Sequence, residues 1–179
     1  MASNLTQTLS FGVHEGAAFN DATTLGGFPN TQGIKSIKQI RLMAGWLIDG
    51  MEVTYQMNDG STKADNHLGT GKPNVTINFN DDEVLVCVTG KTTLPGYYQN
   101  KPYLCYLKFV IVNTASGNIR VEGPFGNGAG DAKYTGKTFS VAGPILAFAG
   151  QSISGNEPAN ALTLSFLKSE QLALGKGLQ

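Results

Sequence analysis

Two apolar stretches near the end of the chain decide the fold: Pro144–Gly150 (PILAFAG) and Ala161–Phe166 (ALTLSF). Each has the length of a strand and is bounded by Gly, Pro or Asn, as is typical of a buried β-strand. Between them, residues 151–160 are polar and rich in Ser, Gly and Asn. Because binding residues concentrate in loops held by rigid strands, the pattern predicts a strand–loop–strand unit. We expect its loop to form half of a binding site, with a glycine-containing loop near residue 16 as the other half.

The rest of the chain repeats these strand signals. Further strands are expected at residues 8–11, 37–43, 46–48, 51–57, 75–79, 84–88, 103–112 and 119–122. Helical spacing is present at residues 34–42, but the isoleucine content and the glycine at position 45 favour a strand there. Asn58-Asp59-Gly60 supplies the turn of a hairpin. Residues 21–33 are expected to form a surface connection, and residues 169–174 at most one helical turn. The sequence therefore predicts an all-β protein.

A weak internal repeat supports this prediction. Phe79–Gly90 and Phe139–Gly150 share an alternating strand, a tight turn, an apolar strand and a closing glycine, and Ile40–Gly50 is a looser copy. Unrelated hairpins often look alike, so the pattern alone is a weak signal. Taken as a repeat, it predicts three related sheet units around one core, with pseudo-threefold symmetry.

Composition excludes several classes of protein. The 179 residues suffice for one domain, and 13 basic residues balance 13 acidic ones, so no net field attracts nucleic acid or an anionic membrane. No apolar run is long enough to span a membrane, so we expect no membrane insertion. The first residues lack the features of a signal peptide. We therefore expect a protein that is cytoplasmic or released without a classical signal peptide, and buried free thiols are favoured over a disulfide for Cys87 and Cys105.

Several short motifs, in a fixed order, resemble the jacalin-related lectins from about residue 7 to residue 167. They are QTLSFG (7–12), GAAFND (16–21), LIDGMEVTY (47–55), NH (66–67), DEVLVCVTG (82–90), LKF (107–109), GPFG (123–126), GKTFS (136–140) and ILAFAG (145–150). The resemblance implies a β-prism I fold, with three four-stranded Greek-key sheets. It also implies a single lectin domain over residues 1–179, with a core from about 7 to 167 and a short tail.

The resemblance implies a carbohydrate site between the first and last loops. The backbone N–H of Gly16 would donate to a sugar hydroxyl, and the last loop would contribute Glu157, Ala159 and Asn160. Family members carry Gly-x-x-x-Asp in that loop, but here Asn160 stands at the Asp position and Pro158 lacks a backbone donor. Together these losses cost roughly 2 kcal/mol, or about thirty-fold in affinity. Glu157 is the carboxylate available to replace the missing charge.

Other prominent residues are aromatic side chains and histidines. Tyr97 and Tyr98, in an insertion at residues 91–102, can stack on the apolar face of a sugar or simply close their own loop. His14 lies in the first loop and can touch a ligand there. His67 is expected to be a structural histidine near a turn, and Trp46 to pack at a sheet edge.

No arrangement of residues predicts an enzyme, a metal centre or a cofactor. The chain has two histidines and lacks Cys-x-x-Cys, His-Glu-x-x-His and a nucleophile elbow. The acidic residues 81–83 are interpreted as a hairpin turn.

Two functional classes remain. The first is a lectin for mannose-containing glycans. The resemblance implies this sugar because galactose-binding relatives are cleaved just before the position of Gly16, whereas this chain is continuous there. The second is a β-prism module that binds a protein or membrane partner and has lost or altered its sugar site. The resemblance also implies a homo-oligomer, expected to be a homodimer that gains avidity from linked sites.

Overall fold

The computed structural model describes residues 5–26, 33–69, 71–93, 101–126, 135–156 and 159–169. Their elements are β1 (Leu5–Gln7), β2 (Ala17–Asn20), α1 (Asp21–Thr24), β3 (Ile34–Ala44), β4 (Ile48–Met57), β5 (Thr62–His67), β6 (Val75–Asn78), β7 (Glu83–Thr93), β8 (Leu104–Asn113), β9 (Ile119–Phe125), β10 (Thr135–Asn156) and β11 (Ala159–Ser169). Apart from the single turn α1, the regular elements are strands, which confirms the all-β prediction. Asn20 caps α1 by accepting a hydrogen bond from the Thr23 backbone N–H at 3.0 Å.

The strands form three four-stranded units with the same Greek-key order. In the first unit the spatial order is β6-β3-β4-β5, and in the second it is β10-β7-β8-β9. In the third unit β10 lies between β2 and β11, and β11 pairs with β1. In every unit the fourth strand lies beside the first, which is the Greek-key arrangement. In the third unit the four strands are counted in the order β10, β11, β1 and β2. The β-prism prediction is therefore confirmed, and the third unit is assembled from both ends of the chain.

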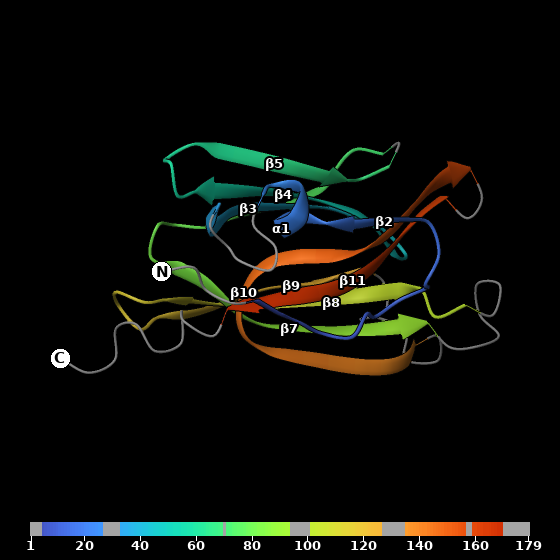
Figure 1. The fold of residues 1–179 in the computed structure, drawn as a ribbon. Coiled ribbons are helices and arrows are strands. Elements are labelled where there is room, and N and C mark those ends of the chain that lie inside the picture. Colours follow the sequence, from blue (N-terminus) through green and yellow to red (C-terminus); the bar gives the residue numbers. More distant parts are fainter. Residues whose placement is uncertain are drawn as a thin grey trace.

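One strand belongs to two units. The first part of β10 pairs with β7 as far as Ile145, and from Ile145 onward β10 pairs with β11. Figure 1 shows this orange strand turning from the bottom of the view into the middle layer, with β3, β4 and β5 above. The second and third units are therefore one continuous seven-stranded sheet, because the chain passes between them without a break in its pairing.

The internal repeat has a structural basis different from the one expected. Phe79–Gly90 runs from β6 into β7, and Phe139–Gly150 runs along β10 from its pairing with β7 to its pairing with β11. Both copies thus lead from the last strand of one unit to the first strand of the next. The looser copy, Ile40–Gly50, is the β3–β4 hairpin inside the first unit, so it is not equivalent to the others.

Several local expectations were wrong at their boundaries. The first strand covers residues 5–7, whereas residues 8–11 contribute a single bridge between Phe11 and Leu164. Residues 17–20 form the unpredicted strand β2, and α1 replaces the start of the expected surface connection. Trp46 lies in the turn between β3 and β4, with 51% of its surface exposed. Tertiary pairing decides these short elements, because so few residues carry a weak periodic signal.

The inner faces of the three units meet in one core. Tyr55 from the first unit, Phe109 from the second, and Phe148 and Phe166 from the third have no exposed surface. The rings of Phe148 and Phe166 meet edge to face at 5.8 Å between centroids. Burying each such side chain stabilises the fold by about 1.5–3 kcal/mol. The core thus holds the ends of the strands, and the loops beyond them, in fixed relative positions.

Both cysteines are free thiols, as predicted. Cys105 is buried, whereas Cys87 is only half-buried. Burial raises the pKa of the Cys105 thiol to about 11, which keeps this thiol protonated and unreactive at neutral pH.

Candidate functional site

The first loop, residues 12–16, is tied to the third unit and to the core. The backbone N–H of Phe11 donates to the Leu164 carbonyl at 2.8 Å, and Leu164 N–H donates back at 3.0 Å. Val13 is buried in a small cluster with Leu47, Tyr103 and Cys105. This hydrophobic anchor holds the loop at one end of the prism, so the loop presents a defined shape.

A hydroxyl adds a second anchor to the same loop. The Thr163 hydroxyl, in β11, donates to the Val13 carbonyl. Thr163 is 1% exposed, so this hydrogen bond is shielded from water. Nothing near Thr163 in the sequence pointed to this role, because its partner is 150 residues away.

Gly16 allows the first loop to approach β10. It adopts φ = +97°, a conformation that favours glycine. A Cβ atom at this position would lie 2.3 Å from the Ser152 carbonyl oxygen and 3.0 Å from Cγ1 of Ile153. The missing side chain therefore makes room for the protein's own backbone. A larger residue at position 16 would displace the loop, so its effect on binding would not separate ligand obstruction from a shifted loop.

An ion pair joins the first loop to the base of the insertion. Lys101 Nζ lies 2.7 Å from Glu15 Oε2, and this contact raises the pKa of the lysine. The Thr93 hydroxyl donates to the Lys101 carbonyl at 2.6 Å and accepts from the Tyr103 N–H at 3.0 Å. The two ends of the 94–100 segment are thereby held together, with Lys101 beside the first loop. Tyr97 and Tyr98 themselves lie outside the described residues.

The expected last loop is mostly strand. The sequence pattern predicts a loop over residues 151–160, but β10 extends to Asn156 and β11 begins at Ala159. The two strands pair to the tip of the hairpin, where Asn156 is opposite Ala159. The loop prediction was wrong because backbone pairing with β11 overrides the low strand propensity of Ser, Gly and Asn. Ala159 and Asn160 therefore start a strand, and Glu157 lies outside the described residues.

The first loop, the β10–β11 hairpin, the end of β7 and the start of β8 share one end of the prism. In Figure 1 they lie at the right of the view, as blue, orange-to-red and green segments. The register supports this placement, because Ser152 of β10 pairs with Ala17, which directly follows the first loop. Backbone of the two predicted site halves is thus brought together around Gly16 and Ser152.

A groove of about 570 Å³ is lined in part by the first loop. Gly12 and His14 line it from the loop, Thr92 and Thr93 from the end of β7, and Phe139 from β10. His14 is exposed at this groove, and its contact with a ligand stays a prediction. The groove and the Gly16–Ser152 contact thus both involve the first loop.

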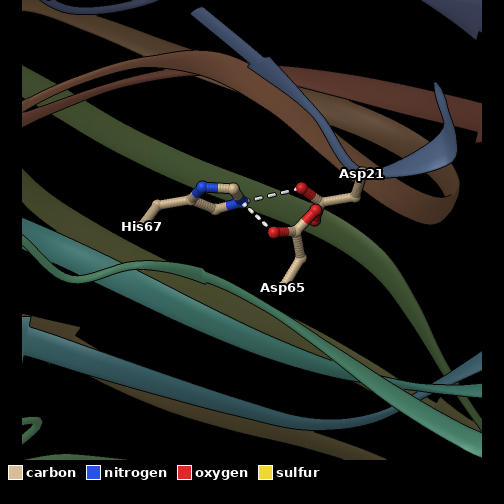
Figure 2. A group of neighbouring side chains, drawn as sticks. All are labelled: Asp21, Asp65 and His67. Carbon is tan, nitrogen blue, oxygen red and sulfur yellow. Dashed lines mark hydrogen bonds and ion pairs between the residues drawn. The ribbon is translucent and has the colours of Figure 1, made fainter. Parts of the chain in front are cut away.

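His67 belongs to a buried polar network that the sequence indicated only in part. Its Nε2 lies 2.7 Å from Oδ1 of Asp21, and the Tyr55 hydroxyl donates to Oδ2 of the same carboxylate. Figure 2 shows the His67 ring nitrogen directed between the carboxylates of Asp21 and Asp65. Phe19 stacks on the imidazole with 3.6 Å between ring centroids. The expectation that His67 is structural agrees with this burial, although its partner 46 residues away was missed.

Burial controls the chemistry of this network. It raises the pKa of Asp21, against the opposing effect of the His67 hydrogen bond, and it raises the pKa of Tyr55 well above its usual value. Ligand-type atoms of Asp21, Asp65 and His67 lie within 4.8 Å of one another. However, both Asp21 oxygens are already engaged in hydrogen bonds within the protein, Oδ2 with the Tyr55 hydroxyl and Oδ1 with His67 Nε2. We interpret the group as a cross-link between α1 and the first unit.

Comparison with known proteins agrees with the fold. The family model described as the jacalin-like lectin domain matches residues 10–156. The chain belongs to the jacalin-like lectin family. As a member of this family it is a carbohydrate-binding lectin and not an enzyme. No match was found among curated protein sequences.

Solved structures similar to this jacalin-like lectin include several proteins described as mannose-binding. A mannose-specific jacalin-related lectin from Morus nigra, solved with mannose, is 24% identical, with a TM-score of 0.67 over 93% of this chain and 96% of that one. A mannose-binding jacalin-related lectin from Ananas comosus is 25% identical, with a TM-score of 0.67 over 92% and 98%. Frutapin, a lectin from Artocarpus incisa, is 22% identical, with a TM-score of 0.67 over 94% and 99%. Within the described part of this lectin, no helix has the length and apolar character needed to cross a membrane.

Proposed function

We propose that this lectin binds mannose-containing glycans at the end of the prism formed by the first loop and the β10–β11 hairpin. The observation that supports it most directly is the contact of Gly16 with Ser152, which sets backbone of the first loop beside backbone of β10 near the hairpin tip. Sugar hydroxyls are recognised by such convergent polar groups on a rigid base. The similarity to solved lectins described as mannose-binding supports the choice of sugar.

Each proposed site residue has a distinct role. The Gly16 N–H donates to a ring hydroxyl, Asn160 replaces the family's aspartate as an acceptor, and Ala159 contributes backbone. Glu157 supplies a carboxylate, and Tyr97 and Tyr98 stack on the apolar face of a second sugar. No nucleic acid and no metal takes part in this binding. We also propose that the protein is a homodimer, because one shallow site binds weakly and two linked sites gain avidity.

A titration with methyl α-mannoside and methyl α-galactoside tests the sugar. We expect binding of the mannoside, and Asn160→Ala should weaken it by about 1–2 kcal/mol through a lost hydrogen bond. Asn160→Asp should strengthen it, because charged acceptors bind hydroxyls about twice as strongly as neutral ones. Thr54→Ala, on the outer face of the first unit, is the matched control. Wild-type titration curves for both Asn160 variants would contradict the proposed site.

The second candidate is an interaction module without a working sugar site. Asn160 and Pro158 favour it. The pairing of Asn156 with Ala159 also favours it, because backbone groups of the hairpin that pair within the sheet are not free to bind a sugar. A glycan array at high protein density separates the two functions. Mannose-containing glycans bound in preference to others would support the lectin, and an array without binding would favour the module.

A further inference from the structure

The outer face of the second unit is apolar, although among the described residues it belongs to neither hydrophobic core cluster. Register pairs Val84 with Val112, and Val110 with Val121. Their neighbours on the buried face are Leu85, Phe109 and Ile111, so these valines point away from the core. We call Val84, Val86, Val110, Val112, Ile119 and Val121 the valine face.

The valine face is accessible to solvent. Ile119 is 67% exposed and Val121 is 48% exposed, and the other four side chains are half-buried. A β-bulge between Leu85 and Cys87 adds Val86 to this side of β7, so three adjacent strands contribute neighbouring apolar residues. Antiparallel sheets with one solvated face normally carry polar residues there. A contiguous apolar patch on such a face marks an interaction surface.

Charges lie at opposite ends of the valine face. At one end, Lys108 pairs with Thr89, and Lys91 lies over the Tyr106 ring at 5.2 Å. At the other end, the exposed turn residue Asp82 directly precedes β7. Along β7, the seven residue steps from Thr89 to Asp82 span at most about 24 Å, taking about 3.4 Å per residue. The midpoint falls near Leu85, between the valines at positions 110 and 112 on the neighbouring strand.

This pattern is self-complementary. A twofold axis in the plane of the face, perpendicular to the strands and near Leu85, would lay the valine faces of two copies together. The same rotation reverses strand direction, so Lys108 of each copy would meet Asp82 of the other. Isologous contacts of this kind are the commonest basis of homodimers. The charge distribution therefore favours a second copy over an unrelated partner.

We infer that the valine face is the surface through which two copies of this lectin associate, by face-to-face packing of their second units. The inference rests on the homodimer proposed above and names its interface. Dimerisation leaves the first loop and the β10–β11 hairpin of each copy accessible, because they belong to the third unit. One dimer thus presents two glycan sites.

Sedimentation velocity of the full chain tests this interface. Runs from about 1 to about 200 micromolar cover the dissociation constants of weak dimers. The wild-type protein should shift from monomer to dimer mass over this range. Val112→Asp should raise the dissociation constant by about 30-fold or more, because it buries an unpaired charge. Thr54→Asp, at a matched strand position on the outer face of the first unit, should leave the constant unchanged, and urea unfolding checks that both variants fold.

Charge reversal tests the orientation of the two copies. Lys108→Glu and Asp82→Lys should each weaken dimerisation by about 3- to 10-fold, because each sets like charges against one another. The double variant should recover most of this loss. A wild-type protein that stays monomeric, a dimer insensitive to Val112→Asp, or a double variant as weak as the singles would overturn the inference.

The glycan proposal is tested separately by titrating the Val112→Asp monomer with methyl α-mannoside. Unchanged affinity for this monovalent sugar, together with lost agglutination of mannan-coated beads, is expected if the face serves only association. Absence of mannoside binding by an intact wild-type dimer would overturn the proposed function and leave the interface standing.

Discussion

The first and second units have the same Greek-key order and bury similar inner faces, yet their outer faces differ in chemistry. On the first unit, Arg41 pairs with Glu52 at 2.7 Å and Gln39 donates to Asn78 at 2.8 Å. On the second unit, the corresponding surface is the valine face. Folding requires only that inner faces be apolar, so the outer faces are free to serve other purposes. The difference shows that symmetry in the fold does not extend to the surface.

The largest effect is expected on an inner face. Phe109→Ala should lower the free energy of unfolding by about 3–5 kcal/mol, because it leaves a cavity in the core. Its neighbour on the outer face provides the comparison: Val110→Ala should cost under about 1 kcal/mol when measured on dilute, monomeric protein. Urea unfolding monitored by circular dichroism gives both values. Similar losses for the two variants would show that the valine face is buried within the monomer.

The polar network gives the next largest effect. Asp21→Ala should destabilise the protein by about 3 kcal/mol, since it leaves His67 and the Tyr55 hydroxyl buried without their partner. Tyr55→Phe removes one buried hydrogen bond and leaves Asp21 Oδ2 without its donor, which should cost about 1–3 kcal/mol. Thermal unfolding of both variants measures these changes. If Asp21→Ala were as stable as the wild-type protein, α1 would not be held by this network.

A pH effect is expected at Asp49, near the turn that joins β3 and β4. Burial raises the pKa of this carboxyl to about 6. Because the folded-state pKa exceeds the unfolded value, Asp49 stabilises the fold below about pH 4, and this contribution is lost as pH rises through 6. Its side chain is only half-buried, so solvent screening limits the difference to about 1 kcal/mol.

Urea unfolding of wild-type protein and Asp49→Asn between pH 4 and pH 8 measures this contribution. The stability of the wild-type protein should fall relative to the variant over that interval. Parallel pH profiles would contradict the raised pKa of Asp49.

The smallest effect on stability is expected from exchanging the two outer surfaces. Val112→Thr on the valine face and Thr54→Val on the first unit should each change the free energy of unfolding by less than about 0.5 kcal/mol. Their effects on association should differ, because only Val112→Thr removes apolar area from the proposed interface. Light scattering over a concentration series distinguishes them. If both variants associated equally strongly, the outer face of the second unit would have no special role in association.

Short-range patterns were sufficient for the fold class and for much of the strand arrangement. Alternation and apolar runs predicted β6, β7 and β8, and the motif order gave the β-prism. Elements stabilised mainly by distant partners were missed, such as β2, which pairs with residues 149–152 of β10. The same limit applied to the site, where Gly16 was found from its motif. Its contact with Ser152, the Thr163 anchor and the Glu15–Lys101 pair depend on residues distant in the chain.

The amino-acid sequence by itself determined that the chain alternates apolar and polar residues in short runs, and hence that it forms sheets around one core. Which unit a strand joins was decided only in three dimensions, as β10 shows by passing from β7 to β11 at Ile145. The valine face arose in the same way. Its members are ordinary apolar residues in the sequence. Only the register of β7, β8 and β9 places them side by side, because backbone pairing decides which side chains are neighbours.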